Sequence, residues 1–447
     1  MERNFTTGSV FKSILYFSVP YLFSYFLQTL YGMADLFIIG QFNGVESTTA
    51  ISAGSQVMHM LTVMITGLAM GSTVIIGRAA GAGETGRINK AVGNTATLFM
   101  FLSIVCMVIL LAAAEWIVHI MSMPEEAVEE AVAYLRICFM GIPFITAYNI
   151  ISSVFRGMGD SKSPMYFIAA ACIFNIVLDY LFIGILGLGA AGAALGTTLS
   201  QTTSVLVSCA VIIVRKMIPG ICRADFRPDK IVLGNILKVG FPVAIQDGFI
   251  QVAFIIITIF ANRRGLDDAA AVGIVEKLIG ILFLVPSSML SAVSALCAQN
   301  IGAKKHGRAG RTLKYATVIA VLFGITVTII MQFIAENATG LFTDNEKVIT
   351  LGGQYMKSYV WDCIFAGVHF CFSGYFCAYG LSLVSFIHNF ASIILARIPL
   401  AYIASKYYTD SLFPMGIAAP AGSLLSVIIC IMAFIWMKHN SAKLERI

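Results

Sequence analysis

The stretch GRAAGAGETGRINKAVG, residues 77 to 93, returns later in the chain as AQNIGAKKHGRAGRTLK, residues 298 to 314. Glycines and an arginine align at a separation of 221 residues: Gly81 with Gly302, Gly86 with Gly307, and Arg87 with Arg308. The same separation, or one residue more, pairs Pro20 with Pro242, Glu125 with Glu346, Tyr134 with Tyr355, and Gly159 with Gly380. A separation that holds over so much of the chain indicates an internal repeat, so we predict two homologous halves.

The composition shows what kind of halves these are. Hydrophobic residues make up 58% of the 447 residues and charged residues 12%, against about 25% charged in an ordinary soluble domain. The mean hydropathy of +0.87 requires apolar segments from one end of the chain to the other. This composition excludes a water-soluble globular protein.

Twelve apolar runs reach about 20 residues, the length at which a helix crosses a hydrocarbon core of about 30 Å. They begin near Phe11, Thr48, Ala91, Val128, Ser163, Ala191, Leu233, Ala269, Thr312, Ile349, Leu383 and Met415. The runs lack the alternation of a barrel strand, so we predict an all-α integral membrane protein with twelve transmembrane helices. Because each half has an even number of spans, the two six-helix lobes should be related by a pseudo-two-fold axis along the membrane normal.

A polar segment between the sixth and seventh spans separates the two predicted lobes. It reads PGICRADFRPD, with two prolines and several charges, and no other polar stretch is long enough to join two helix bundles. We therefore predict an N-lobe over residues 1–217, a cytoplasmic linker over residues 218–231 and a C-lobe over residues 232–447.

The basic residues predict the orientation, because lysine and arginine beside membrane spans stay in the cytoplasm. Of the 29, 21 lie at the two termini and in alternate loops, whereas the opposite loops hold four. Those four are Arg263, Arg264, Lys347 and Lys406. We expect a multi-pass protein of the plasma (inner) membrane with both termini cytoplasmic. The net charge of +6 follows from this bias, and without a basic soluble domain no nucleic-acid partner is expected.

Five acidic residues lie within apolar spans, where a charge is costly and therefore points to function. They are Asp35, Asp179, Asp247, Glu276 and Asp362. Asn175 precedes Asp179 by four residues, so both side chains share one helix face and their oxygens can converge on a small cation or a proton. The alternative is that Asn175 hydrogen-bonds a protonated Asp179 only to bind two helices together.

The acids of the second half allow simpler explanations. Glu276 is followed by Lys277 and Asp362 follows Trp361, so an ion pair or a position at the membrane interface accounts for each. Asp247 lies beside Gln246 and shortly after Pro242, where a kinked helix can open toward a cavity.

The chain carries no motif of an enzyme. It has no HExxH sequence and no Ser-His-Asp order, so neither an enzymatic activity nor a cofactor is expected. Cys363, His369, Cys371 and Cys377 are metal-type ligands, but their spacing does not place them on one helix face, so no metal centre is predicted there.

Several segments together resemble the multidrug and toxic compound extrusion (MATE) family of transporters, of prokaryotic type. They are DLFIIGQFNG from Asp35, the turn from Gly77 to Gly83, RGMGDSK from Arg156, and the stretch from Asn175 to Asp179. The resemblance covers nearly the whole chain, including the span count and the repeat.

This resemblance implies a cation-coupling site in the N-lobe. Its residues would be Asp35, Asn149, Asn175, Asp179 and Thr197, with Thr198 as an alternative hydroxyl. The site would take H⁺, or Na⁺ at Asp35, Asn175 and Asp179. A further branch of the family has acids on the seventh and tenth spans, which match poorly here, near Ile250 and about a turn from Asp362. The resemblance therefore favours coupling through the N-lobe.

The expected function is antiport by alternating access, in which H⁺ or Na⁺ enters and small organic, mainly cationic, drugs or toxic metabolites leave. The protein should act as a monomer in the lipid bilayer. Candidate substrate-cavity residues are Gln28, Tyr31, Gln246, Asp247 and Gln251. Two alternatives remain at this stage. A flippase for lipid-linked saccharides or peptidoglycan precursors would need a cationic cavity, and an uncoupled channel would need a continuous pore.

Overall fold

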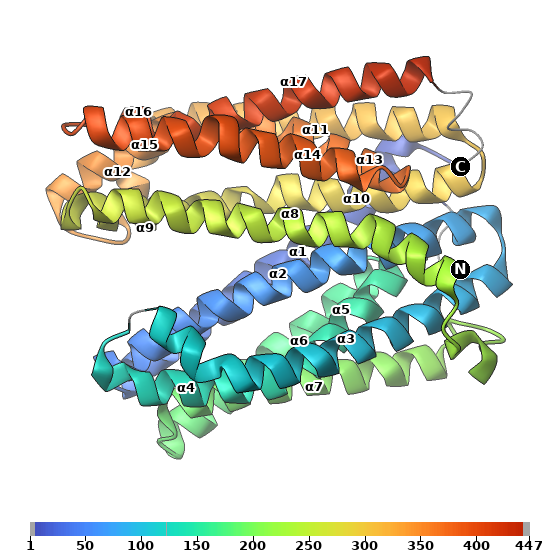
Figure 1. The fold of residues 1–447 in the computed structure, drawn as a ribbon, viewed down its shortest axis with the longest axis horizontal. Coiled ribbons are helices and arrows are strands. Elements are labelled where there is room, and N and C mark those ends of the chain that lie inside the picture. Colours follow the sequence, from blue (N-terminus) through green and yellow to red (C-terminus); the bar gives the residue numbers. More distant parts are fainter. Residues whose placement is uncertain (1–4, 122, 441–447) are drawn as a thin grey trace. The chain divides into compact units, whose positions relative to one another are not determined.

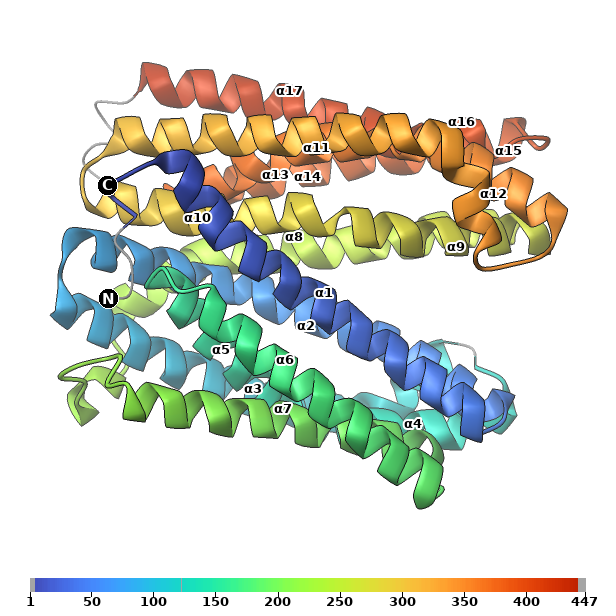
Figure 2. The same cartoon turned by 180° about the vertical axis from the view of Figure 1, so that it is seen from behind.

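The structure, a computed structural model, describes residues 5–121 and 123–440 (Figures 1 and 2). Within these residues the chain forms helices joined by short turns, with no strand. The predicted all-α fold class is confirmed.

The first half contains seven α-helices and one π-helical segment. Their bounds are α1 (Val10–Phe42), α2 (Val45–Ala82), α3 (Thr85–Ile120), α4 (Glu125–Met140), α5 (Ile142–Gly157), α6 (Lys162–Asp179), the π-helical η1 (Tyr180–Ile185) and α7 (Gly189–Val214). A short 3-10 helix, η2 (Arg223–Phe226), follows in the linker.

The second half contains ten α-helices and a second π-helical segment. Their bounds are α8 (Lys230–Asn262), α9 (Leu266–Leu282), α10 (Leu284–Gly302), α11 (His306–Gly340), α12 (Glu346–Tyr359), α13 (Asp362–Ala378), α14 (Ser382–Ser392), the π-helical η3 (Ile393–Arg397), α15 (Ile398–Tyr407), α16 (Phe413–Gly416) and α17 (Ala418–His439).

Twelve membrane spans can be formed from these helices. Among the described residues, ten helices or joined helices are long and apolar enough, and two bent pairs supply the remaining spans. The pairs are α4 with α5, bent by 46°, and α12 with α13, bent by 42°. The bends fall at Gly141 and just before Asp362, positions that the repeat equates. The predicted twelve spans are thus accounted for, each half with one broken span in the same place.

The chain forms two compact units whose boundaries lie inside helices. Unit 1 covers Val19–Gly240, and unit 2 combines Phe5–Ser18 with the described residues from Phe241 onward. In α1 the boundary between the units lies directly before Pro20, and in α8 it lies directly before Pro242. A proline inside a helix removes one backbone hydrogen bond, so both boundaries lie where the helix is locally weakened.

Each unit has its own apolar core, and the repeat is visible in both. Tyr134 packs in the core of unit 1 with Ile51 and Phe139. Its counterpart Tyr355 packs in the core of unit 2 with Tyr359 and Met356. Both tyrosine side chains are buried, which explains why the repeat shows so clearly at this position.

The linker lies along the first half of α3. Asn94 Nδ2 donates to Asp225 O at 3.1 Å, and Thr97 Oγ1 donates to Phe226 O at 2.8 Å. Asn89 Nδ2 donates in the same way to Pro219 O at 3.0 Å. These polar side chains of α3 satisfy backbone groups of the linker and so attach it to unit 1.

An ion pair reinforces this attachment. Lys90 pairs with Asp229, whose carboxylate also accepts hydrogen bonds from the backbone N–H groups of Ile231 and Val232 at the start of α8. Lys90, together with these backbone donors, lowers the pKa of Asp229. Asp229 therefore caps α8 while it holds the linker on α3.

Candidate functional site

Three helices of unit 1 bring four of the predicted coupling residues together. Asp35 comes from α1, Asn175 and Asp179 from α6, and Thr197 from α7. The side chains of Asp179 and Asn175 lie against that of Asp35. Asp179 is the last residue of α6 before η1, and such π-helical insertions often occur at functional sites.

The site is closed to solvent. Asp35, Asn175 and Asp179 are each at most 3% exposed. Thr197 Oγ1 donates a hydrogen bond of 3.2 Å to Asp35 Oδ2. Thr198 Oγ1 instead points to Ile137 O at 3.5 Å, so Thr197 is the hydroxyl that reaches the acid.

The remaining oxygens of the site have no donor. Asp35 Oδ1, both carboxylate oxygens of Asp179 and the carboxamide of Asn175 are buried without a hydrogen bond among the described residues. Buried polar atoms without partners are costly, so proteins retain them for a reason. Carboxylate, carboxamide and hydroxyl oxygens gathered at one point suit a small hard cation such as Na⁺, and a pair of carboxyl groups suits a proton.

Among the described residues, no basic side chain is paired with these two acids. In the part of the chain that the structure describes, no lysine or arginine forms an ion pair with Asp35 or Asp179. Two carboxylates this close cannot both stay charged without a counter-charge.

Gly196 on α7 makes the room for Asp179. A Cβ atom at this position would lie 2.1 Å from Asp179 Oδ1 and 3.6 Å from Asn175 Nδ2. Real Cβ contacts are never this short, so α7 can approach the acid only with glycine here.

Asn149 is oriented differently from the other predicted coupling residues. Its Oδ1 accepts from Thr66 Oγ1 at 2.9 Å and its Nδ2 donates to Ile145 O at 2.9 Å. The carboxamide is thus satisfied by α2 and by its own helix α5, and its hydrogen bonds among the described residues do not include one to Asp35.

Two neighbours of the site were not singled out as coupling residues. Tyr31, four residues before Asp35, lies beside Asp35 and Gln201. Gln201, four residues after Thr197, is 5% exposed and its Oε1 has no hydrogen bond among the described residues. The helical spacing of four residues from Thr197 is the signal that could have found Gln201.

The five predicted cavity residues divide between the two units. Gln28 and Tyr31 are half-buried residues of α1 in unit 1, whereas Gln246, Asp247 and Gln251 belong to α8 in unit 2. Gln246 is buried and accepts a hydrogen bond of 2.8 Å from Ser385 Oγ, which ties α8 to α14. Asp247 and Gln251 are half-buried.

Unit 2 has acids of its own, and these face an arginine. The Arg397 side chain, from η3, lies close to both Asp362 and Glu276, donates to the hydroxyl of Tyr359 and packs on the ring of Phe254. Thr258 Oγ1 donates to Glu276 at 3.3 Å. Lys277 is exposed, so the basic side chain near these two acids is that of Arg397, which acts on them through its charge without an ion-pair contact among the described residues.

The stretch with metal-type ligands has other contacts. His369 packs edge-on against His388, with 5.6 Å between the ring centroids, and His388 hydrogen-bonds to Ser373 and Ser426. In the described part of the chain, no three His, Cys, Asp or Glu side chains are placed to bind a metal ion together.

Two repeated bundles of membrane helices with an unpaired, buried acid pair define a secondary transporter rather than an enzyme. The chain belongs to the MatE family, because the family model described as MatE matches residues 20–181 and again residues 242–403. The two matches are separated by 222 residues and so reproduce the internal repeat.

Relatives and solved structures agree with this membership over nearly the whole chain. The chain is 26% identical to the probable multidrug resistance protein YoeA of Bacillus subtilis, over 98% of this chain and 96% of that protein. It is 25% identical to the probable multidrug resistance protein NorM of Thermotoga maritima, over 98% and 95%. A structure titled as the outward-facing conformation of a multidrug resistance MATE family transporter has the same fold, with a TM-score of 0.90 at 23% identity, covering 99% of this chain and 98% of that one.

Proposed function

We propose that this transporter exports small organic, mainly cationic, compounds in exchange for H⁺ or Na⁺. The coupling ion binds at Asp35 and Asp179, in a protein of the plasma (inner) membrane whose termini face the cytoplasm. One observation carries the proposal: the two acids are buried side by side with oxygens that have no partner.

Antiport requires the ion and the organic cation to compete for one site, and the acid pair provides that site. With H⁺ or Na⁺ bound, Asp35 and Asp179 are neutralised, and Asn175 and Thr197 complete the set of oxygens around the ion. When the ion leaves, negative charge remains in a closed apolar region and favours entry of an organic cation. Ion and cargo therefore alternate, and each exchange by alternating access carries one against the other.

The number of ions decides how strongly the membrane drives export. One coupling ion exchanged for a monovalent cation moves no net charge, so only the ion gradient contributes, about 1.4 kcal/mol per tenfold difference. If Asp35 and Asp179 each take a proton, the second charge adds about 2.3 kcal/mol per 100 mV. Two acids in one site therefore permit a steeper accumulation ratio than one.

The chemistry of the two units favours coupling in the N-lobe. Arg397 lies beside Asp362 and Glu276, so an internal cation already offsets those acids. Among the described residues, no lysine or arginine acts on Asp35 or Asp179 as Arg397 does on Asp362 and Glu276. An external ion consequently gains more at the N-lobe pair.

The test is transport in liposomes with one gradient at a time. Purified protein is reconstituted, a proton gradient or a sodium gradient is imposed, and ethidium accumulation is followed by fluorescence for wild type, Asp35→Asn and Asp179→Asn. Asp362→Asn serves as the matched control, because it removes an equally buried acid from unit 2.

We expect one of the two gradients to drive ethidium in the wild type. Asp35→Asn and Asp179→Asn should each lower the rate by at least about tenfold, whereas Asp362→Asn should keep most of it. Loss in the control with retention in the N-lobe variants would place coupling in unit 2 instead. No movement of ethidium under either gradient, with folded protein, would overturn the antiport proposal and favour the flippase.

A further inference from the structure

Unit 2 contains a basic cavity whose lining includes none of the acids discussed above. It has a volume of about 680 Å³ and is formed by the start of α11 and the ends of α13 and α17. Cavities of this size hold a drug-sized group or part of a lipid. It belongs to the end of the unit that the distribution of lysine and arginine predicts to be cytoplasmic.

The rim of the cavity is basic. It carries His306, Arg311 and Lys314 from α11 and Lys438 from α17, and none of its described lining residues is acidic. Arg311, Lys314 and Lys438 are exposed and form no ion pair within the described residues. Lys438 Nζ instead lies over the ring of Phe434, 5.1 Å from its centroid. Positive charges gathered around a hollow without counter-charges favour an anion there.

The floor of the cavity is aromatic. Phe372 and Phe434 pack with 5.6 Å between ring centroids, and Tyr375 lies 5.7 Å from Phe434 and 4.9 Å from Tyr379. Tyr379 OH and His306 Nδ1 are 3.0 Å apart, which links the floor to the rim. The cavity therefore offers apolar surface below and positive charge above, as an anionic amphiphile requires.

The apolar surface continues out of the cavity along α11. Val318, which lines the cavity, is 47% exposed, and Leu322 and Ile325 follow on the same helix face at 60% and 40%. Such side chains on a membrane helix contact acyl chains. A free anion such as phosphate would use only the rim, whereas a phospholipid would use the rim and this stripe.

The repeat shows what occupies the corresponding face of α3 in unit 1. On α3, Asn89, Gly93 and Thr97 lie against the linker backbone. Their counterparts 221 residues later are Gly310, Lys314 and Val318, and all three line the cavity. The face that the linker covers in unit 1 is thus hollow and basic in unit 2.

We propose that this cavity binds the phosphate headgroup of an anionic phospholipid from the surrounding bilayer, with an acyl chain along the exposed face of α11. Arg311, Lys314 and Lys438 contact the phosphate, and the aromatic floor contacts the glycerol and the upper part of the chain. Basic cavities between membrane helices on the cytoplasmic side are suited to such headgroups. The site is separate from the acids that carry the proposed transport function.

Native mass spectrometry of the full chain released from detergent tests this site. The probes are phosphatidylglycerol and phosphatidylcholine with identical acyl chains, and inorganic phosphate as competitor. A charge variant combines Arg311→Gln, Lys314→Gln and Lys438→Gln. Its control removes three exposed charges outside the cavity, through Lys12→Gln, Lys230→Gln and Lys304→Gln.

A second variant blocks the cavity without changing its charge. Gly307 lines the cavity and has open space where a side chain would begin, so Gly307→Trp should fill it. Gly86, its repeat counterpart on α3, also has open space, and Gly86→Trp is therefore the matched control.

We expect wild type and both controls to retain one phosphatidylglycerol, with at least about tenfold preference over phosphatidylcholine, and both cavity variants to lose it. Equal binding of the two lipids, or phosphatidylglycerol retained by Gly307→Trp, would overturn the proposal. Displacement of the lipid by millimolar phosphate would show a site for free anions and would overturn it as well. If the charge variant unfolds, the Gly307→Trp and Gly86→Trp pair decides alone.

Discussion

The absence of a side chain at Gly196 determines whether α7 can lie close to Asp179. We expect Gly196→Ala to abolish gradient-driven transport, because the new Cβ would overlap with Asp179 Oδ1 and push the acid away from Asp35. Overpacking of this kind costs about 1 to 3 kcal/mol, so the protein should still fold. Ethidium transport in liposomes and thermal unfolding in detergent measure the two effects.

Gly40→Ala is the matched control for this change. Gly40 follows Asp35 by five residues on α1 and has nothing within 4 Å of the added Cβ. Transport by Gly196→Ala at the wild-type rate would mean that Asp179 does not need its present position.

Gly83 and Lys304 occupy the same turn in the two repeats with different chemistry. Both have left-handed backbone, with φ of 74° and 59°, and the turn closes with equivalent hydrogen bonds, Glu84 N to Ala79 O and Lys305 N to Asn300 O. A non-glycine residue in this region costs about 1 kcal/mol. Lys304→Gly should therefore raise the free energy of unfolding by about 0.5 to 1 kcal/mol, after allowance for the more flexible unfolded chain.

The reciprocal change should have the opposite sign. Gly83→Lys places a side chain in the same conformation in unit 1 and should lower stability by about 1 kcal/mol. Thermal unfolding in detergent compares both variants with wild type, and equal effects of the same sign would refute the backbone explanation.

At the level of single residues, the sequence predicted which acids form the candidate site but not all of the side chains that surround them. Asp35, Asn175, Asp179 and Thr197 do converge, because helical spacing and small residues on α7 place them on facing surfaces. The alignment alone could not separate Thr197 from Thr198, since only the rotation of α7 decides which hydroxyl faces Asp35. Whether these residues couple transport stays a prediction.

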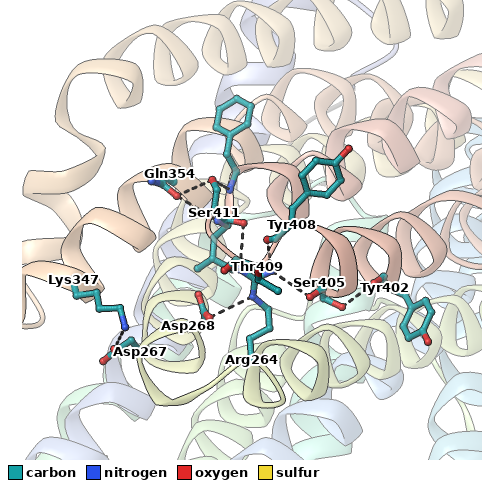
Figure 3. A network of polar contacts seen from close by, with 12 residues as sticks. Arg264, Asp267, Asp268, Lys347, Gln354, Tyr402, Ser405, Tyr408, Thr409 and Ser411 are labelled. Carbon is teal, nitrogen blue, oxygen red and sulfur yellow. Dashed lines mark hydrogen bonds and ion pairs between the residues drawn. The ribbon is translucent and has the colours of Figure 1, made fainter.

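Arg264, at the turn between α8 and α9, joins several elements of unit 2 (Figure 3). Its guanidinium donates to the backbone oxygens of Tyr408 at 2.8 Å and Thr409 at 3.0 Å, and its Nε lies 3.4 Å from Asp268. Ser411 Oγ, in the same loop, donates to Gln354 Oε1 on α12 at 2.8 Å. These contacts explain why an arginine stands at the end of the protein that is otherwise poor in basic residues.

Arg264→Ala should destabilise this end of unit 2 strongly. The change leaves several backbone carbonyls without their donor and Asp268 without its ion-pair partner, and the Arg264 side chain is only 5% exposed, so we expect a loss of about 3 kcal/mol. The neighbouring Arg263 is exposed, and Arg263→Ala should cost less than about 0.5 kcal/mol. Thermal unfolding compares the two, and similar losses would show that the contacts in Figure 3 contribute little.

Helices as whole elements were the most predictable part of the fold. All twelve spans were predicted as long apolar runs, because hydropathy and length alone identify a membrane helix. The breaks between α4 and α5 and between α12 and α13 were not predicted, since an apolar run reads the same whether it is straight or bent. The π-helical segments η1 and η3 were missed for the same reason, although each interrupts a span.

At the scale of the whole molecule, Arg308 attaches the beginning of the described chain to unit 2. Its guanidinium donates to Phe5 O at 3.0 Å, Thr7 O at 2.7 Å and Gly8 O at 2.7 Å. Lys305 Nζ adds a hydrogen bond to Thr6 O at 2.9 Å. This is why residues 5–18 belong to unit 2 although α1 continues into unit 1.

Arg308→Ala should release this segment. We expect the backbone amides from Phe5 to Gly8 to exchange with deuterium at least about tenfold faster, because three charge-assisted hydrogen bonds are lost together. Within the described residues, Arg87, the repeat counterpart, forms its ion pair with the exposed Glu84, so Arg87→Ala should leave this exchange unchanged. Unaltered exchange in Arg308→Ala would mean that the other contacts, such as the hydrogen bond from Lys305 to Thr6, hold the segment without Arg308.

The repeat in the sequence predicted two halves but not how the chain is distributed between the units. Composition alone suggests that the chain divides at the polar linker. The boundaries between the two compact units lie instead within α1 and α8, directly before Pro20 and Pro242. Both helices read as uninterrupted apolar spans, and nothing in an apolar run says which neighbours it will have.

This distribution of the chain has a consequence for biosynthesis. A ribosome completes the segments of unit 1 only after Gly240 has been made, whereas residues 5–18 of unit 2 are translated before the rest of their unit. These residues therefore wait without their final partners until α10 and α11, which carry Gln299, Asn300 and Arg308, have entered the membrane. Insertion machinery that shields an unpaired first helix would protect this chain for most of its synthesis.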